Sequence, residues 1–156
     1  MLKQFLSLTI ICMVFVSCKP DLCEDVNCNN GSCDSGTCLC ETGYEGVNCE
    51  IEQRLAFVGD YNVSESCDLG NFDYIINVTA DSEIGSELTI HNIGDFDFDV
   101  IANIDGSSFS LNNVVVTGGT INGMGNLSGA TLNITYTFET TSGQTINCSM
   151  TCSLIE

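Results

Sequence analysis

Two residues of this sequence have the chemical types of a nucleophilic pair. His91 is the single histidine, and Cys152 lies in an alternating segment near the end of the chain. A thiol and an imidazole act together only when the thiolate is accessible, whereas the neighbours of Cys152 predict a buried thiol in apolar surroundings. The G-x-S-x-G, H-E-x-x-H and P-loop patterns are also missing from the sequence. We therefore predict that the protein is not an enzyme and carries no cofactor.

A second group of interest consists of Asp95, Asp97 and Asp99, which alternate with apolar residues. On an extended strand this spacing puts the three carboxylates on one face. Carboxylate oxygens at that pitch could hold calcium. A solvated strand face with its aromatic side chains in the core fits the same spacing. We adopt that interpretation and predict no metal, with a calcium site at the three aspartates as the alternative.

Six cysteines between residues 21 and 50 have a regular spacing. They read C-x4-C-x4-C-x4-C-x-C-x8-C and are Cys23, Cys28, Cys33, Cys38, Cys40 and Cys49. This spacing, with Gly43-Tyr44-x-Gly46 before the last cysteine, resembles an EGF-like domain. The resemblance implies three disulfides, which join Cys23 to Cys33, Cys28 to Cys38 and Cys40 to Cys49. A segment this short buries too little apolar surface to fold alone, so the bridges must stabilise it.

The EGF-like segment shows no convincing metal site. Zinc sites are built from C-x2-C pairs or histidines, and neither occurs here. Calcium-binding EGF-like domains carry an acidic run before the first cysteine, and Lys19-Pro20-Asp21-Leu22 does not fit that run. We expect this segment to act as a spacer, with protein contact as the alternative.

The first 17 residues have the features of a secretory signal peptide. Lys3 supplies the positive charge, and the apolar stretch over 5–16 is too short to span a bilayer. The next residue is Cys18, and Phe15-Val16-Ser17-Cys18 resembles the lipobox of bacterial lipoproteins. That resemblance implies acyl chains on Cys18, which would anchor the protein in the membrane through a tether over 18–22. The alternative is an ordinary signal peptide cut near Ser17.

From residue 54 to residue 156 the sequence alternates apolar and polar residues between Gly, Asn and Asp turns. In residues 131–140 one apolar face comprises Leu132, Ile134, Tyr136 and Phe138. The expected strands cover 56–64, 73–80, 86–93, 95–104, 107–116, 119–124, 130–140 and 144–155. These short strands predict an all-β fold, in which a small antiparallel β-barrel or sandwich follows the EGF-like segment.

Three cysteines remain in this β domain. Cys148 and Cys152 share the inward face of the last strand but stand about 13 Å apart at the rise of a strand. A disulfide needs Cα atoms within about 7 Å, so Cys67 can pair with only one of them. Residues 57–64, Cys67 and a cysteine in the last strand resemble small lipocalin-like domains of Bacteroidetes surface lipoproteins. We predict a Cys67–Cys148 bridge and a buried free thiol at Cys152, with Cys67–Cys152 as the alternative.

Charge and cysteine content limit the possible partners. The chain has 21 acidic residues against 3 basic ones and a net charge of −18, which excludes nucleic acid because no basic patch can neutralise phosphates. Eleven cysteines in 156 residues indicate an oxidising compartment. We expect an outer-membrane, lipid-anchored protein of the cell envelope, displayed on the cell surface, that binds an extracellular protein or glycan. The alternative is a structural lipoprotein facing the periplasm, with a filled barrel and no ligand.

Overall fold

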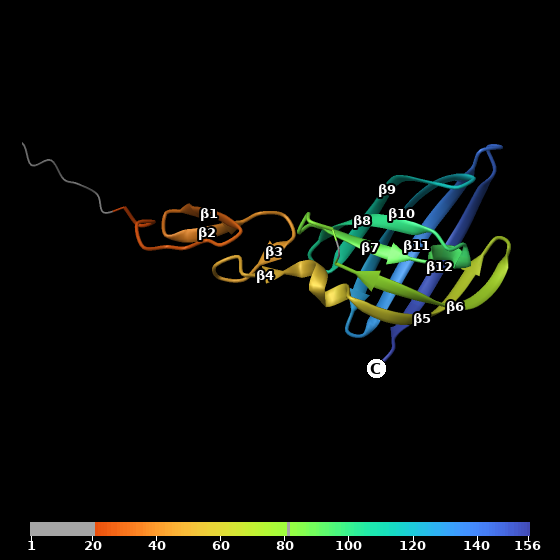
Figure 1. The fold of residues 1–156 in the computed structure, drawn as a ribbon, viewed down its shortest axis with the longest axis horizontal. Coiled ribbons are helices and arrows are strands. Elements are labelled where there is room, and N and C mark those ends of the chain that lie inside the picture. Colours follow the sequence, from red (N-terminus) through yellow and green to blue (C-terminus); the bar gives the residue numbers. More distant parts are fainter. Residues whose placement is uncertain (1–20, 81) are drawn as a thin grey trace, which may run out of the picture.

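The computed structural model describes residues 21–80 and 82–156. They form a narrow disulfide-linked segment that leads into a closed β-barrel (Figure 1). The expected signal peptide at 1–17 and Cys18 lie outside the described residues, as does most of the expected tether. In the described part of the chain, no helix has the length and apolar character needed to cross a membrane.

The disulfide-linked segment consists of two small antiparallel hairpins. β1 (Gly31–Asp34) pairs with β2 (Thr37–Cys40), and β3 (Tyr44–Glu45) pairs with β4 (Ile51–Glu52). Its disulfides join Cys23 to Cys33, Cys28 to Cys38 and Cys40 to Cys49, the pairing that the EGF resemblance implies. Among residues 21–50 only Gly43 and Cys49 are buried. The segment thus has almost no apolar core, and its bridges hold the hairpins together.

Eight antiparallel strands form the barrel, and the all-β fold class is confirmed. The strands follow one another around the wall in chain order, and the last pairs with the first to close it. They are β5 (Gly59–Cys67), β6 (Gly70–Thr79), β7 (Glu87–His91), β8 (Asp99–Asp105), β9 (Ser108–Val116), β10 (Gly119–Ser128), β11 (Thr131–Thr140) and β12 (Thr145–Leu154).

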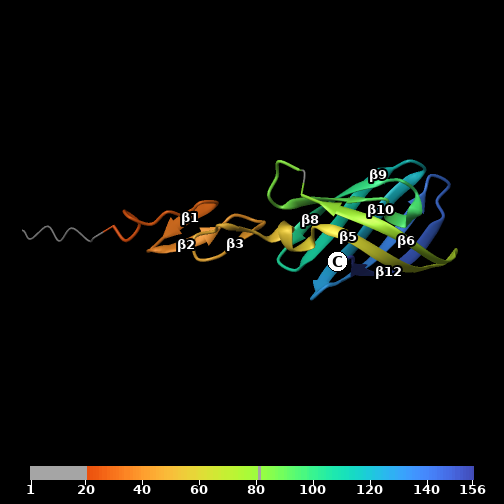
Figure 2. The same cartoon turned by 60° about the horizontal axis from the view of Figure 1, so that its bottom comes forward.

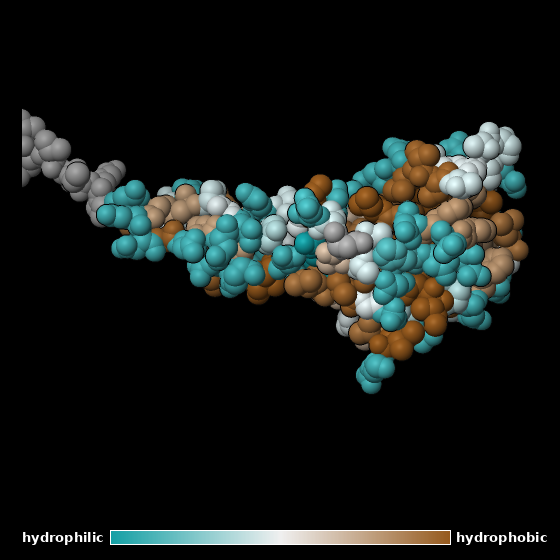
Figure 3. Space-filling view, viewed as in Figure 1, coloured by the Kyte–Doolittle hydropathy of each residue, from teal (hydrophilic) through white to brown (hydrophobic). Residues whose placement is uncertain are grey.

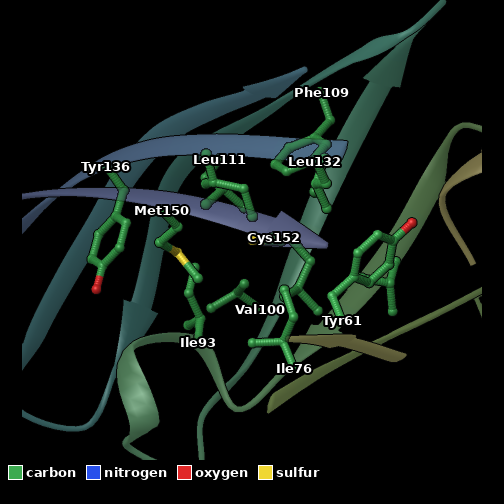
Figure 4. Close-up of a cluster of buried hydrophobic side chains, with 14 of the residues drawn as sticks. Tyr61, Ile76, Ile93, Val100, Phe109, Leu111, Leu132, Tyr136, Met150 and Cys152 are labelled. Atoms are coloured by element: carbon green, nitrogen blue, oxygen red, sulfur yellow. The ribbon is translucent and has the colours of Figure 1, made fainter. Parts of the chain in front are cut away.

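Period-two alternation explains why these residues form strands with one buried face. Burial alternates without a break along β8 and along most of β12, so every second side chain points into the barrel. Figure 4 shows Leu111, Met150 and Cys152 among the side chains directed into the interior. Apolar side chains therefore fill most of the barrel, as expected for eight strands.

The predicted strand over 95–104 begins too early. β8 starts at Asp99, and a short 3-10 turn, η2 (Ile93–Asp95), comes before it. Asn92, Gly94, Asp95 and Asp97 all have φ between 55° and 70°. These left-handed conformations interrupt an extended strand. The prediction that Asp95, Asp97 and Asp99 share one strand face is therefore wrong.

A short 3-10 helix, η1 (Gln53–Phe57), connects the disulfide-linked segment to the barrel. Its Arg54 is 8% exposed, and the guanidinium donates to the carbonyls of Ser82 at 2.6 Å and Ile84 at 3.0 Å. The same group forms an ion pair of 2.7 Å with Glu52. Arg54 thus ties the connecting helix to the loop that precedes β7.

The backbones of the two parts also approach closely at this junction. The Gln53 N–H donates to the Gly43 carbonyl at 2.9 Å, and the Gly106 N–H donates to the Gln53 side chain at 3.2 Å. A Cβ on Gly43 would lie 2.6 Å from the Gly85 carbonyl oxygen, and one on Gly85 would collide with the Tyr44 ring. Only glycine fits at both positions. The segment is therefore seated on one end of the barrel and extends from it in both views (Figures 1 and 2).

Candidate ligand-binding site

A cavity of about 260 Å³ opens at the end of the barrel opposite the disulfide-linked segment. The end of β5, the start of β6, η2 and the β11–β12 hairpin surround it. Its lining is mostly apolar and comprises Glu65, Cys67, Leu69, Phe72, Gly94, Asp95, Phe96, Tyr136, Phe138, Ile146 and Cys148. The barrel is therefore hollow at this end, although its middle is filled.

The cavity contains a buried carboxylate. In β5 the inward positions are Tyr61, Val63 and Glu65, and Glu65 is only 3% exposed. Glu65 and Arg54 are the buried charged residues of the described chain, and Arg54 lies at the other end of the barrel. A charge in an apolar interior is costly unless hydrogen bonds or an opposite charge compensate for it. The hydrogen bonds and charges around Glu65 therefore determine which chemical groups the cavity can bind.

Two tyrosines hold the Glu65 carboxylate in place. The Tyr136 hydroxyl donates to Oε1 at 2.6 Å, and the Tyr74 hydroxyl donates to Oε2 at 3.0 Å. The Gly94 N–H in turn donates to the Tyr74 hydroxyl at 3.0 Å. A carboxylate has about four lone-pair sites, and these two bonds use half of them. Since Glu65 lines the cavity, its remaining acceptor capacity is available to a bound molecule.

Burial and the nearby carboxylate keep both phenols protonated. The pKa of Tyr136 is well above its ordinary value, mainly because of burial and then because of its hydrogen bond to Glu65. The pKa of Tyr74 is raised mainly by burial and then by the negative charge of Glu65. Both tyrosines therefore act as neutral donors at physiological pH, and neither neutralises the carboxylate.

Large apolar side chains form the rim of the cavity. Leu69 is 59%, Phe72 42% and Phe96 53% exposed. The Phe96 ring centroid lies 6.5 Å from that of Phe138, which extends the aromatic surface inward. Figure 3 shows apolar residues in several patches on the barrel, whereas the disulfide-linked segment is largely hydrophilic on this face. Exposed apolar side chains around a concave surface are typical of a binding site.

None of the residues that line the cavity is basic. Asp95, at the rim, adds a second carboxylate. The only lysine or arginine in the described ranges is Arg54, which is already bonded at the opposite end. His91 lies outside the barrel, where its ring bonds Asp99 at 2.8 Å and Thr79 at 3.0 Å. The electrostatic character of the cavity is therefore negative.

A disulfide forms part of the cavity wall. Cys67 and Cys148 face each other across the β5–β12 pair, and their sulfurs are bonded. This is the predicted bridge, and it leaves Cys152 as a buried free thiol. The side chains of Glu65, Cys67 and Cys148 also lie close enough to form a candidate metal group. Because the two sulfurs are bonded to each other, neither is a thiolate ligand.

The structure separates the other residues that the sequence singled out. Asp99 bonds His91 on the outer wall, Asp97 lies in the turn before β8, and Asp95 borders the cavity. These three carboxylates do not form a group suited to an ion among the described residues.

Cys152 and His91 lie on opposite sides of the barrel wall. Cys152 points inward from β12, whereas His91 is half-exposed on β7. Burial, with a smaller effect from the charge of Glu65, raises the pKa of the Cys152 thiol to about 12. A thiol with that pKa is protonated and unreactive at neutral pH.

The sequence patterns did not predict a site at Glu65 or its hydrogen bonds to two tyrosines. One signal was present, because Glu65 occupies an apolar position of the alternation that contains Tyr61 and Val63. An acid at an inward position is an exception that indicates a function or a partner. Tyr74 comes from β6, which pairs with β5, but Tyr136 comes from β11, and a single sequence does not show that β11 and β5 lie on either side of β12.

No protein-family model matches this chain, and no curated protein matches it. Among solved structures, it is similar to the crystal structure of zebrafish ileal bile acid-binding protein complexed with cholic acid. The two share 14% sequence identity with a TM-score of 0.38, and the match covers 64% of this chain and 99% of that one. A similarity at this level says nothing of a ligand for this chain.

Proposed function

We propose that this chain is a non-catalytic binding protein of the cell envelope, whose barrel takes a small, largely apolar ligand in the cavity around Glu65. The observation that carries the proposal is the cavity itself. It combines an exposed apolar rim with a buried carboxylate that has unused acceptor capacity. Most pockets for small molecules have this composition, in which apolar walls supply affinity and a few polar groups orient the ligand.

The position of the cavity agrees with a role as a displayed receptor. The disulfide-linked segment leaves the barrel at one end, and the cavity opens at the other. An acylated Cys18 would place the membrane on the side of this segment, so the cavity would open away from the membrane. In this proposal the EGF-like segment is a stiff spacer, and the outer membrane is the site of the anchor.

A second candidate is a structural envelope protein without a ligand. The filled interior favours this candidate, because one continuous cluster of buried apolar side chains, which includes Phe57 and Met150, occupies the barrel. An extracellular protein or glycan is a third kind of partner, and it would contact the polar outer faces of the strands. Both candidates differ from the first in one respect, since neither needs the cavity around Glu65.

An NMR titration of the purified, oxidised chain with 4-phenylbutan-1-ol, a small neutral amphiphile, distinguishes these candidates. We expect saturable chemical-shift changes that cluster at Leu69, Gly94 and Ile146. The Ile146→Phe variant should abolish them by filling the cavity. The matched control is Ile101→Phe, which adds the same ring at a half-exposed site on the outer face of β8. An absence of shifts in the wild-type protein would contradict the proposed function and would leave the two candidates that do not need the cavity.

A further inference from the structure

We infer that the ligand of this cavity is a small organic cation, an amine with an apolar body, whose ammonium group pairs with Glu65. This inference rests on the proposed function, because it names the chemical class of the ligand for the same site. Four observations carry it: the charge of the cavity, its aromatic walls, the fixed geometry of the carboxylate and the size of the space.

The charge of the cavity requires a positive partner. Glu65 is 3% exposed and receives hydrogen bonds from two neutral phenols only. Asp95 lies at the rim, and the lining contains no lysine, arginine or histidine. A buried carboxylate without a counter-charge strongly attracts a cation and repels an anion, because the effective dielectric constant is low there. The net charge of −18 for the whole chain adds a field of the same sign.

The aromatic walls suit the same kind of group. Phe72, Phe96 and Phe138 line the cavity with the Tyr136 ring. The negative face of an aromatic ring attracts an ammonium group, and this attraction is strongest where water is excluded. The hydrocarbon part of the ligand can lie against the exposed rings at the rim.

The two tyrosines act as positioning residues for the carboxylate. Each phenol donates to a different oxygen of Glu65, and the Gly94 N–H fixes the Tyr74 hydroxyl. The carboxylate is therefore held in one orientation before a ligand arrives. A group that is positioned in advance loses little conformational entropy on binding.

The volume limits the size of the ligand. Pockets for drug-sized molecules range over about 300–1,000 Å³, and this cavity measures about 260 Å³. A ligand with one ring or a short alkyl chain fits, whereas a long acyl chain or a multi-ring body does not fit inside.

Three probes with one body and different head groups test the inference. They are 4-phenylbutylamine, 4-phenylbutan-1-ol and 4-phenylbutyrate, which are positive, neutral and negative at pH 7. We expect the amine to bind the oxidised chain about tenfold more tightly than the alcohol, since it forms a charge-assisted bond, and we expect no saturable binding of the carboxylate. Calorimetry or NMR titration gives each Kd.

The outcomes separate this inference from the proposed function. If the alcohol or the carboxylate binds as tightly as the amine, the ligand is not a cation, but the cavity remains a binding site. If none of the three binds, the proposed function fails, and this inference fails with it.

A charge-neutral variant tests the role of Glu65 directly. Glu65→Gln keeps the shape of the side chain and can still bond both tyrosines, so the amine should bind it about as weakly as the alcohol does. The matched control is Glu139→Gln, which removes one charge from an exposed position of β11 and should leave both Kd values unchanged. Equal loss of amine affinity in both variants would overturn the inference. If Glu65→Gln does not fold, the three probes on the wild-type protein decide alone.

Discussion

Tyr136 donates a hydrogen bond of 2.6 Å to Glu65, which lies 71 residues earlier in the chain. The two residues belong to strands that are not neighbours, because β12 lies between β11 and β5 in the wall. The bond therefore spans β12 on the inner face of the barrel wall. It fixes the orientation of the one buried carboxylate that lines the cavity.

Removal of this donor should destabilise the protein. In Tyr136→Phe the buried Glu65 loses one of its two partners, and a buried polar group without a partner costs about 1–3 kcal/mol. Urea unfolding followed by circular dichroism gives the free energy of unfolding. The control is Thr135→Val, an outward neighbour on β11, for which we expect a change within about 0.5 kcal/mol. An unchanged midpoint for Tyr136→Phe would show that the bond contributes nothing.

Alkaline pH should weaken the folded state, because three buried groups of the barrel are held in their protonated forms. Burial raises the pKa of Cys152 from 9.0 to about 12 and raises those of Tyr74 and Tyr136. The unfolded chain therefore releases these protons at lower pH than the folded chain does. The stability that the protonated forms of these three groups contribute is fully present below pH 9. It is lost as the pH rises toward their pKa values in the folded protein.

Urea midpoints at pH 7, 9 and 10.5 check this expectation. The midpoints should be similar at pH 7 and pH 9, and the midpoint at pH 10.5 should be lower. Cys152→Ala should reduce the dependence on pH, although the smaller side chain lowers stability at every pH. In the folded wild-type protein Cys152 should resist a thiol reagent at pH 8, and it should react within minutes in urea. Rapid labelling of the folded protein would contradict the burial of this thiol.

Arg54 should control the stiffness of the junction between the disulfide-linked segment and the barrel. In Arg54→Ala the carbonyls of Ser82 and Ile84 lose their charged donor, while the barrel core is untouched. We expect a loss of about 1–3 kcal/mol and a segment that moves more freely. NMR relaxation of residues 21–50 should show faster motion in the variant, with no change in Leu55→Ala, an exposed neighbour on η1. Identical relaxation in all three proteins would mean that Arg54 does not fix the junction.

The proposed anchor makes a prediction about the location of the protein in the cell. Wild-type protein should be found in the outer-membrane fraction, and its intact mass should include acyl chains and four disulfides. Cys18→Ser should be recovered in the soluble fraction with the same disulfides, because the acyl chains supply the membrane affinity. Protease treatment of intact cells tests surface display, since it should remove the wild-type protein. A membrane-bound Cys18→Ser variant would rule out lipid anchoring at this residue.

Alternation in the sequence predicted the strands, because a strand with one buried face repeats every two residues. Each of the eight predicted ranges overlaps one strand of the barrel, although the bounds of several differ by a few residues. The prediction failed at 95–98, where alternating aspartates and phenylalanines imitate a strand. There the chain turns through left-handed conformations at Asp95 and Asp97, and alternation of residue types does not reveal a positive φ.

The site was harder to predict than the fold, because it depends on contacts across the interior. Strand geometry alone excluded a Cys148–Cys152 bridge, since the rise per residue fixes their separation. Tyr74 lies diagonally opposite Glu65 in the β5–β6 pair, but no comparable rule connects Glu65 to Tyr136. The bond between Glu65 and Tyr136 depends on the closure of the barrel and on the inclination of its strands.

Closure of the barrel by β12 and β5 has a consequence for crowding. An open sheet ends in a row of unpaired N–H and C=O groups, on which another molecule can add a strand. In this barrel β12 pairs with β5 over Cys148–Leu154 and Tyr61–Cys67, so the wall has no such end. The barrels of neighbouring copies therefore offer no open strand edge to one another, and the barrel provides no template for fibril growth.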